Sequence, residues 1–342
     1  MKHIAPVLLV LLLLACRPAV FGEEVLGQGE FRYRVVQGWA APALAQVHVK
    51  NGHGLAIDGA GRILFLTDDA RNNVIILSPA GDLIETWTAR MPGAHGLTLV
   101  QEGDKEVLFV TDTALHEVRK LTLKGGELLH LPWPESTGLY KKADEYKPSK
   151  VLIAPHGEFY VFDGYGKDYV HHYAADGRLM SSWGGSIGEG ENQLAHFGPH
   201  GGVVDTRDPA NPVVFICMSD KQEVKRFTLD GKFIDKFAMP GGNPRDAVLW
   251  GDHLFIPHLG DQWPKDKNAP GFVSVLDKHN KVLSNIGGTP PQYDAQGLLQ
   301  PMHTTTKAFI HPHGVTVDKD GNVYVAQFSS PSAPLIKLER IK

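Results

Sequence analysis

A short pattern of apolar and polar positions recurs along this chain. Its clearest copy runs from His95 to Leu121 and reads as a His-Gly pair, an apolar strand, a turn, a second apolar strand ending in Thr-Asp, a loop and a third strand. Further copies begin at Asn51, Gly198 and His311, and a weaker copy from Lys147 lacks the leading histidine. Short strands repeated at intervals of roughly 40 to 70 residues are typical of a β-propeller.

The repeats predict an all-β fold with six blades, and no stretch shows a sustained helical period. Turns such as Asp176-Gly177 and Asp230-Gly231 separate runs rich in β-branched and aromatic residues, as expected of hairpins. The fifth blade carries an insert at Asp261–Pro270, and the polar stretches Lys141–Lys150 and Gly288–Phe309 are loops long enough to cover a face of the disc. We expect the blades at about His53–Trp87, His95–Leu121, Pro148–Trp183, His200–Phe237 and Asn243–Leu283, and from His313 to the end of the chain.

A propeller must close into a ring, and usually one terminus completes the blade that the other terminus begins. Phe31–Trp39 alternates weakly and precedes the first repeat, so we expect this segment to pair with Pro334–Ile341 in blade six. Because one kind of repeat spans nearly the whole chain, residues 23–342 are predicted to form a single propeller domain of the NHL-repeat type.

Composition narrows the possible functions only a little. The chain has 342 residues, a net charge of −4 and 21% charged residues, so it lacks the basic surface of a nucleic-acid-binding protein. Its 37 glycines and 23 prolines fit a fold with many tight turns. Cys217 is the one cysteine in the body of the chain, and its apolar surroundings predict a buried core thiol.

The N-terminus has the features of an export signal over residues 1–22. A basic start is followed by an apolar run from Val7 to Ala15, which is too short to serve as a membrane-spanning helix. The run Leu13-Leu14-Ala15-Cys16 resembles a bacterial lipobox, which would leave a lipid-anchored Cys16, whereas ordinary cleavage near Gly22 is the alternative. We therefore expect an exported bacterial protein, either free in the periplasm or medium or anchored at the cell envelope.

The repeats also place six residues in one register at the mouth of the first strand of each blade. The first strand lies nearest the axis, so these side chains should meet around the central channel. Those of blades two, four and six are His95, His200 and His313, which should lie about 120° apart around a six-fold disc. Three imidazoles with an open position form a catalytic zinc site, although other divalent metals also accept imidazole. The complete set in this register is His53, His95, Ser149, His200, Arg245 and His313.

The remaining histidines have other interpretations. A single His-Gly pair at a strand entrance is usually a turn histidine, and it is the recurrence in alternate blades that favours a metal. His53 can be a fourth ligand, a hydrogen-bond donor behind the ligands or a turn residue. His156 should lie in a hairpin of blade three away from the ring, and His171 and His172 should lie exposed on an outer strand.

Several segments resemble peptidyl-hydroxyglycine amidating lyase, the propeller enzyme that completes peptide C-terminal amidation, and its bacterial relatives. The similarity covers nearly all of the chain after the export signal, and the pattern VTD-ALH-V and the pattern GDQ-spacer-GFV are its more specific parts. The matching segments are HGLTLV…FVTDTALHEVRKL, FYVFDGYGKDYVHHYAADGRLMSSWG, FGPHGGVVD, HLGDQWPKDKNAPGFV and PHGVTVDKDGNVYVAQ.

The resemblance implies that His95, His200 and His313 hold zinc and that Tyr165 is the catalytic tyrosine. The family's substrate is a carbinolamide, in which one carbon bears both a hydroxyl and an amide nitrogen, and the products are an amide and glyoxylate. A metal makes such a hydroxyl more acidic, and a base then removes its proton. A tyrosine beside a cation can act as that base because the positive charge lowers its pKa of about 10.

The chain departs from the family pattern where the family binds the substrate carboxylate. The family uses arginines for this bidentate contact, which lysine makes poorly. The blade-four arginine is replaced by Lys221, and Arg71 of blade one is the match to the other. Arg245 points into the predicted ring and can substitute, which is an inference from its position and not from the resemblance.

A second departure concerns calcium. The family's structural calcium uses an acidic residue directly after the third histidine, where this chain has Gly314. The Leu97 carbonyl, a candidate calcium contact, is retained, but the missing carboxylate argues against a Ca²⁺ ion.

Three functions therefore compete at the level of sequence. The first is a zinc-dependent carbon–nitrogen lyase acting on a small or peptide-terminal hydroxy compound. The second is a non-catalytic exported propeller that binds a protein or a glycan, because a fold alone does not fix a function. The third is another metal-dependent hydrolase of the lactonase-like kind, which would require acidic and amide ligands around the axis instead of imidazoles.

Overall fold

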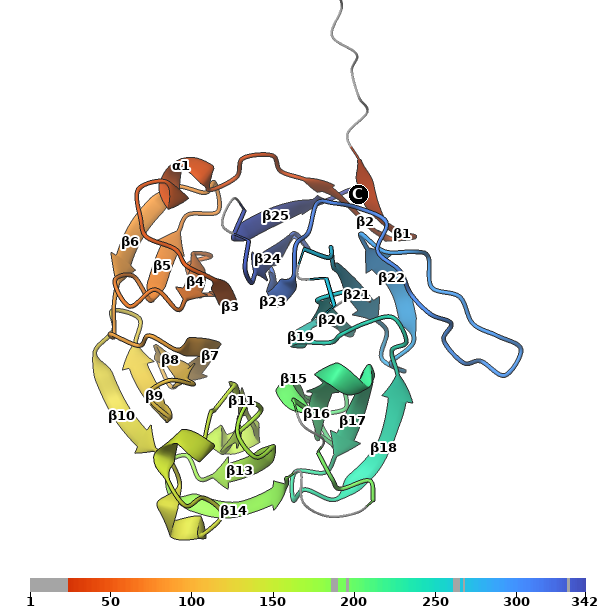
Figure 1. The fold of residues 1–342 in the computed structure, drawn as a ribbon. Coiled ribbons are helices and arrows are strands. Elements are labelled where there is room, and N and C mark those ends of the chain that lie inside the picture. The colour runs from red at the N-terminus through yellow and green to blue at the C-terminus, as the bar shows by residue number, and fades with distance from the viewer. Residues whose placement is uncertain (1–23, 186–189, 195–196, 261–264, 267, 331–332) are drawn as a thin grey trace, which may run out of the picture.

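The computed structural model describes residues 24–185, 190–194, 197–260, 265–266, 268–330 and 333–342. The described residues form six antiparallel sheets arranged in a ring around a central axis, as Figure 1 shows, so the six-bladed β-propeller predicted from the repeats is confirmed. Helix is limited to α1 (Ala41–Leu44) and a few single 3₁₀ turns among these residues.

Five of the sheets are four-stranded blades whose strands follow chain order from the axis outward. Blade one contains β3 (Gly52–Ile57), β4 (Ile63–Thr67), β5 (Val74–Leu77) and β6 (Leu83–Trp87). Blade two contains β7 (Ala94–Glu102), β8 (Lys105–Asp112), β9 (Glu117–Thr122) and β10 (Glu127–Pro132). Blade three contains β11 (Lys150–Ile153), β12 (Phe159–Phe162), β13 (Tyr169–Tyr173) and β14 (Leu179–Gly184). Blade four contains β15 (Pro199–Asp205), β16 (Val213–Met218), β17 (Glu223–Phe227) and β18 (Phe233–Ala238). Blade five contains β19 (Val248–Trp250), β20 (His253–His258), β21 (Phe272–Leu276) and β22 (Val282–Ile286).

Blade six joins the two ends of the described chain. It contains β23 (Pro312–Val317), β24 (Val323–Gln327) and β25 (Leu335–Arg340), followed by β2 (Phe31–Val35) and β1 (Val25–Gln28). β2 pairs antiparallel with β25, with Val35 opposite Leu338, so the predicted closing strand is confirmed. The strand ends at Val35 instead of Trp39, and the edge strand β1 was not predicted.

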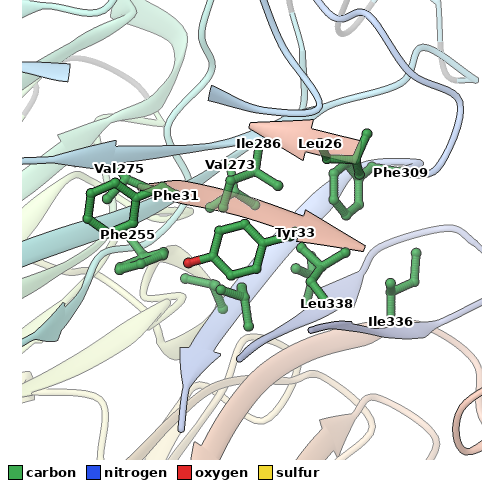
Figure 2. Close-up of a cluster of buried hydrophobic side chains, with 13 residues drawn as sticks. Leu26, Phe31, Tyr33, Phe255, Val273, Val275, Ile286, Phe309, Ile336 and Leu338 are labelled. Carbon is green, nitrogen blue, oxygen red and sulfur yellow. The ribbon is translucent and has the colours of Figure 1, made fainter. Parts of the chain in front are cut away.

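Each blade packs against its two neighbours through apolar side chains, and this explains the burial pattern of the strands. Every residue of the inner strands β4, β5 and β12 is buried, because a neighbouring blade covers each face. The outer strand β18 alternates between half-buried and exposed positions. Figure 2 shows one of these interfaces, where Phe31, Tyr33 and Leu338 of blade six meet Phe255 and Val273 of blade five. The first strands are therefore held firmly around the axis.

The prediction for His171 and His172 was wrong, because both side chains are buried in β13. The Tyr140 hydroxyl lies 2.7 Å from Nε2 of His171, and the Ser182 hydroxyl lies 2.8 Å from its Nδ1. Burial lowers the pKa of His171 to about 3. The loop before β11 covers this strand, which the strand pattern alone could not reveal. His172 stacks on Tyr160 with ring centroids 4.4 Å apart.

Three other expectations concern single segments. Cys217 is buried, as predicted. His156 lies in the turn between β11 and β12, as predicted. The expected export signal at residues 1–22 lies outside the described residues, as does part of the insert at 261–270. In the described part of the chain, none of the helices has the length and apolar character needed to span a membrane.

Ring closure generates a prediction for Leu338, which is buried between β2 and β24. Leu338→Ala should lower the free energy of unfolding by about 2–4 kcal/mol, because it leaves a cavity at the seam. The measurement is urea unfolding monitored by tryptophan fluorescence. The control is Leu298→Ala at a position 64% exposed, which should change the free energy by less than about 0.5 kcal/mol. Equal effects in the two variants would contradict the role given to the seam.

Candidate metal centre

The structure brings the three predicted ligands together at the axis. The ring centroids of His95 and His313 lie 4.8 Å apart, those of His95 and His200 lie 5.0 Å apart, and those of His200 and His313 lie 4.9 Å apart. All three side chains are buried. They come from the first strands of blades two, four and six, which face one another across the axis in Figure 1.

A repeated hydrogen bond fixes how each imidazole is oriented. Nδ1 of His95 lies 2.8 Å from the Ser149 carbonyl oxygen, and Nδ1 of His200 lies 2.6 Å from that of Arg245. Nδ1 of His313 lies 3.2 Å from the His53 carbonyl oxygen. A carbonyl oxygen can only accept, so each Nδ1 carries the proton and each Nε2 keeps a lone pair. This is the tautomer that a metal ligand of this kind requires.

The six register residues therefore divide into two alternating sets. Blades two, four and six supply the imidazoles, and in each case the next blade around the ring supplies the carbonyl. The glycine after each histidine completes the arrangement. A Cβ atom on Gly96, Gly201 or Gly314 would lie less than 3.0 Å from the same carbonyl oxygen that accepts the histidine Nδ1–H. The His-Gly pairs of the sequence thus reflect close packing between neighbouring blades.

His53 belongs to the group but is held differently. Its ring centroid lies 4.9 Å from those of His95 and His313, and ligand atoms of these three residues lie within 4.8 Å of one another. Three histidines of this cluster can therefore hold a metal ion. Nδ1 of His53 has no hydrogen-bond partner among the described residues, and its Nε2 lies 3.7 Å from Oδ2 of Asp68. We favour His95, His200 and His313 as the ligand set, because a hydrogen bond from Nδ1 to a carbonyl oxygen fixes the tautomer of each.

Burial controls the charge of these imidazoles. It lowers the pKa of His95, His200 and His313 well below the ordinary value, and the positive charges that neighbouring histidines and Arg245 would carry add to the effect. The three rings are therefore neutral at physiological pH. Neutral imidazole is the form that binds a metal, so no proton has to be displaced.

Tyr165 lies directly over the histidines. Its hydroxyl oxygen is 2.7 Å from Nε2 of His200 and 3.2 Å from Nε2 of His95. Burial raises the pKa of Tyr165, whereas the positive charge of Arg245 acts in the opposite direction. The phenol is thus placed where a cation on the Nε2 atoms would lower its pKa against the effect of burial.

The loop that carries Tyr165 is fixed by a buried carboxylate. Asp163 accepts hydrogen bonds from the backbone N–H groups of Lys147 and Lys167, at 2.6 and 2.7 Å, and from the Tyr140 hydroxyl at 2.8 Å. Burial raises the pKa of Asp163 to about 6. The Asp163-Gly164-Tyr165 segment therefore has a rigid base on blade three.

Two cavities reach this group from the same face. One has a volume of about 810 Å³ and is lined by His53, Asp68, His95 and Tyr165 among others. The second has a volume of about 260 Å³, and its lining is Tyr165, Phe197, Asp220, Arg245, Leu259, His313 and Phe328. Tyr165, Phe197 and Phe328 line both cavities, so the aromatic side chains lie between them.

Of the three cationic candidates, the structure brings Arg245 into the site. Its side chain is 5% exposed, it lines the smaller cavity, and its Nε has no hydrogen-bond partner in the described part of the chain. Arg71 instead makes a two-point contact with Asp69, with Nε 2.9 Å from Oδ1 and Nη2 2.6 Å from Oδ2, and its side chain is 63% exposed. Lys221 is exposed, and its neighbour Asp220 lines the cavity.

Sequence reasoning missed Asp68, Phe328, Phe197 and Asp220. Asp68 and Phe328 occupy equivalent positions in blades one and six. Asp68 directly follows Thr67, which lies opposite Gly52 at the start of β3. Phe328 directly follows Gln327, which lies opposite Pro312 at the start of β23. Extending the repeat alignment to the ends of the second strands would have found both. Phe197 directly precedes the repeat copy that begins at Gly198, and it is the first residue of the matching segment FGPHGGVVD.

The surroundings of the Leu97 carbonyl oxygen show whether the residues present fit a calcium ion at that position. This oxygen accepts a hydrogen bond from Nζ of Lys150 at 3.3 Å, and the same Nζ lies 2.7 Å from Oδ2 of Asp246. Gly314 supplies no side-chain ligand. A positive charge already lies against the carbonyl, so the residues present do not fit a calcium ion there.

Comparisons with known proteins show what the chain as a whole is similar to. No protein-family model matches the chain. "Peptidyl-alpha-hydroxyglycine alpha-amidating lyase 1" of Drosophila melanogaster is 26% identical over 273 residues, which cover 75% of this chain and 47% of the relative. "Probable peptidyl-alpha-hydroxyglycine alpha-amidating lyase pgal-1" of Caenorhabditis elegans is 28% identical over 302 residues, with 81% and 77% covered. The chain thus spans about half the length of the fly relative and most of the nematode one.

Solved structures support the fold. Virginiamycin B lyase from Staphylococcus aureus superposes with a TM-score of 0.54 at 14% identity, covering 85% of this chain and 95% of that one. A luciferin-regenerating enzyme superposes with a TM-score of 0.52 at 12% identity, covering 86% and 93%. At such low identity the likeness concerns the propeller architecture alone.

The division into two sets predicts which histidines are metal ligands. His95→Ala, His200→Ala and His313→Ala should each lose the bound metal, whereas His53→Ala should retain about one ion per chain. The measurement is metal analysis by mass spectrometry after dialysis, with circular dichroism to confirm folding. If His53→Ala loses the metal while His200→Ala keeps it, the ligands are His53, His95 and His313 instead.

Proposed function

We propose that this chain, an NHL-type six-bladed propeller related to the peptidyl-alpha-hydroxyglycine alpha-amidating lyases, is an exported zinc-dependent lyase. Its reaction would cleave the carbon–nitrogen bond of a carbinolamide and give an amide and glyoxylate. The observation that carries the proposal is the Tyr165 hydroxyl, which lies within hydrogen-bonding distance of Nε2 of both His95 and His200. A base candidate and a metal-ligand set therefore share one small volume.

The chemistry is divided between the metal and the chain. Zinc held by His95, His200 and His313 would supply a positive charge that makes a substrate hydroxyl more acidic. Tyr165 accepts the hydroxyl proton, and the carbonyl of glyoxylate forms as the carbon–nitrogen bond breaks. The departing amide nitrogen takes up this proton from Tyr165, so the tyrosine returns to the ionised state in which it began. The step involves no oxidation or reduction.

Arg245 is suited to hold the substrate carboxylate. Its guanidinium is buried beside the site, and its Nε lacks a hydrogen-bond partner within the described residues, so an anion arriving there would satisfy a polar group that is otherwise unpaired. Phe197, Leu259 and Phe328 give the same cavity apolar walls. A volume of about 260 Å³ suits a small acyl group or one terminal residue.

Asp220 adds an opposite charge on the wall of the same cavity. Its negative charge raises the pKa of Tyr165, whereas Arg245 lowers it, so the two side chains oppose each other at the base. A carboxylate bound to Arg245 would weaken that lowering, and the zinc charge would then determine when the phenol ionises.

The proposals of export and of the partner rest on the sequence alone. The apolar N-terminus supports secretion, with Cys16 as the site of a lipid anchor in the lipobox interpretation. The partner proposed is a small or peptide-terminal substrate and not a nucleic acid. A scaffold that binds a protein or glycan is the alternative, but such a role would not require neutral, tautomer-fixed imidazoles buried under a tyrosine.

The assignment of Tyr165 predicts the effect of removing its hydroxyl. Tyr165→Phe should reduce glyoxylate release from N-acetyl-α-hydroxyglycine by about 100-fold or more, while the metal content stays at the wild-type level. Glyoxylate is measured by a coupled reductase assay. The matched control is Tyr169→Phe in the same blade, which should keep wild-type activity. Wild-type turnover by Tyr165→Phe would remove the tyrosine from the mechanism.

The assignment of Arg245 predicts a loss that depends on the substrate carboxylate. Arg245→Ala should lower kcat/KM for N-acetyl-α-hydroxyglycine by about 10- to 100-fold, chiefly through KM, because a charge-assisted contact is lost. The corresponding carboxamide, which lacks the charge, should be turned over equally by both proteins. Arg71→Ala serves as the control and should behave as wild type. A uniform loss on both substrates would show that Arg245 acts structurally.

A further inference from the structure

An ion pair lies in the central channel next to the histidine group. Nζ of Lys150 is 2.7 Å from Oδ2 of Asp246, and the two side chains are only 13% and 14% exposed. Lys150 directly follows Ser149, and Asp246 directly follows Arg245. Each member of the pair is thus the chain neighbour of a residue whose carbonyl orients a predicted metal ligand.

Both charged groups make further contacts that link several blades. Nζ of Lys150 donates to the Leu97 carbonyl of blade two at 3.3 Å. Oδ1 of Asp246 accepts from the backbone N–H groups of Gly202 in blade four, at 3.2 Å, and of Ala247, at 2.9 Å. The pair therefore connects blade three to segments of blades two, four and five across the axis.

The channel at this level is almost filled. The remaining void has a volume of about 10 Å³, and it is bounded by the six register residues, by Gly54, Gly96 and Gly201, and by Leu97, Lys150 and Asp246. A single water molecule needs about 10–15 Å³. The ammonium and carboxylate groups therefore occupy the centre of the ring themselves.

The oxygen atoms around Nζ are of the kind that bind calcium, namely a backbone carbonyl and a carboxylate. We propose that the Lys150 ammonium is a built-in replacement for a divalent cation, which joins the blades and holds the Ser149 and Arg245 carbonyls in place for His95 and His200. The amino group supplies positive charge without an ion that could dissociate.

This inference is independent of the proposed lyase activity. It requires the propeller and the ion pair but no substrate, and it holds if the histidines serve another purpose. Its test therefore uses thermal stability and not turnover, so that a failure of either proposal can be recognised separately.

Removal of the ammonium should create a calcium requirement. In Lys150→Ala the Asp246 carboxylate is left buried without its partner, which lowers the melting temperature. Addition of about 10 mM CaCl₂, above the 10⁻⁴–10⁻³ M range of weak protein calcium sites, should then raise the melting temperature of this variant by about 3 °C or more. The wild-type melting temperature should not change. Sodium chloride at matched ionic strength is the salt control, and all samples are saturated with zinc.

Three further variants make the test specific. Lys150→Gln, which keeps the length of the side chain and offers an amide oxygen, should respond to calcium like Lys150→Ala and replaces it if the alanine variant does not fold. The double variant Lys150→Ala/Asp246→Ala should lose the response. Lys142→Ala removes an exposed lysine paired with Asp144 and should behave as wild type.

Two results would overturn the proposal. The first is a folded Lys150→Ala and a folded Lys150→Gln whose melting temperatures calcium leaves unchanged. The second is a wild-type protein that calcium stabilises as much as it stabilises the variants, since the position would then not be filled by Lys150.

Discussion

The hydrogen bond from a histidine Nδ1 to the carbonyl of the next blade is the contact on which the candidate site depends. It occurs three times, for His95, His200 and His313, and each time the following glycine packs against the same carbonyl oxygen. A bond of this kind fixes the tautomer and orientation of the ring, and it does so only if neighbouring blades keep a constant separation. The site is therefore as precise as the packing between blades.

That packing comes from apolar side chains placed between the blades and not within a single central core. The axis itself holds polar groups, namely the imidazoles and the Lys150–Asp246 pair. Polar groups are costly to bury unless they are paired, and here almost every one has a backbone or side-chain partner. Arg245 and His53 each keep an unpaired ring or guanidinium nitrogen among the described residues, and both border the cavities. This is the pattern expected where a molecule from outside completes the hydrogen bonding.

Much of this could be predicted from the sequence because the repeat carries positional information. Equivalent positions in a propeller must lie around one axis, so the His-Gly pairs alone predict that His95, His200 and His313 meet there. The closing strand could be predicted because a ring has no other way to satisfy its edges. Burial of His171 could not, since it depends on a loop from a different part of the chain. The Lys150–Asp246 pair was not predicted either, although its partners, 96 residues apart, occupy the same repeat position directly after Ser149 and Arg245.

One of the three histidine–carbonyl bonds differs from the others in where it lies. His313 belongs to the last blade and the His53 carbonyl to the first, so this bond crosses the seam at which β2 meets β25. During synthesis His53 emerges from the ribosome long before His313, and the cluster stays incomplete until the final strands have been made. Closure of the ring and completion of the histidine cluster thus depend on the same final strands. A chain that lacks these strands holds only part of the cluster, so the arrangement of the imidazoles reports whether the propeller has closed.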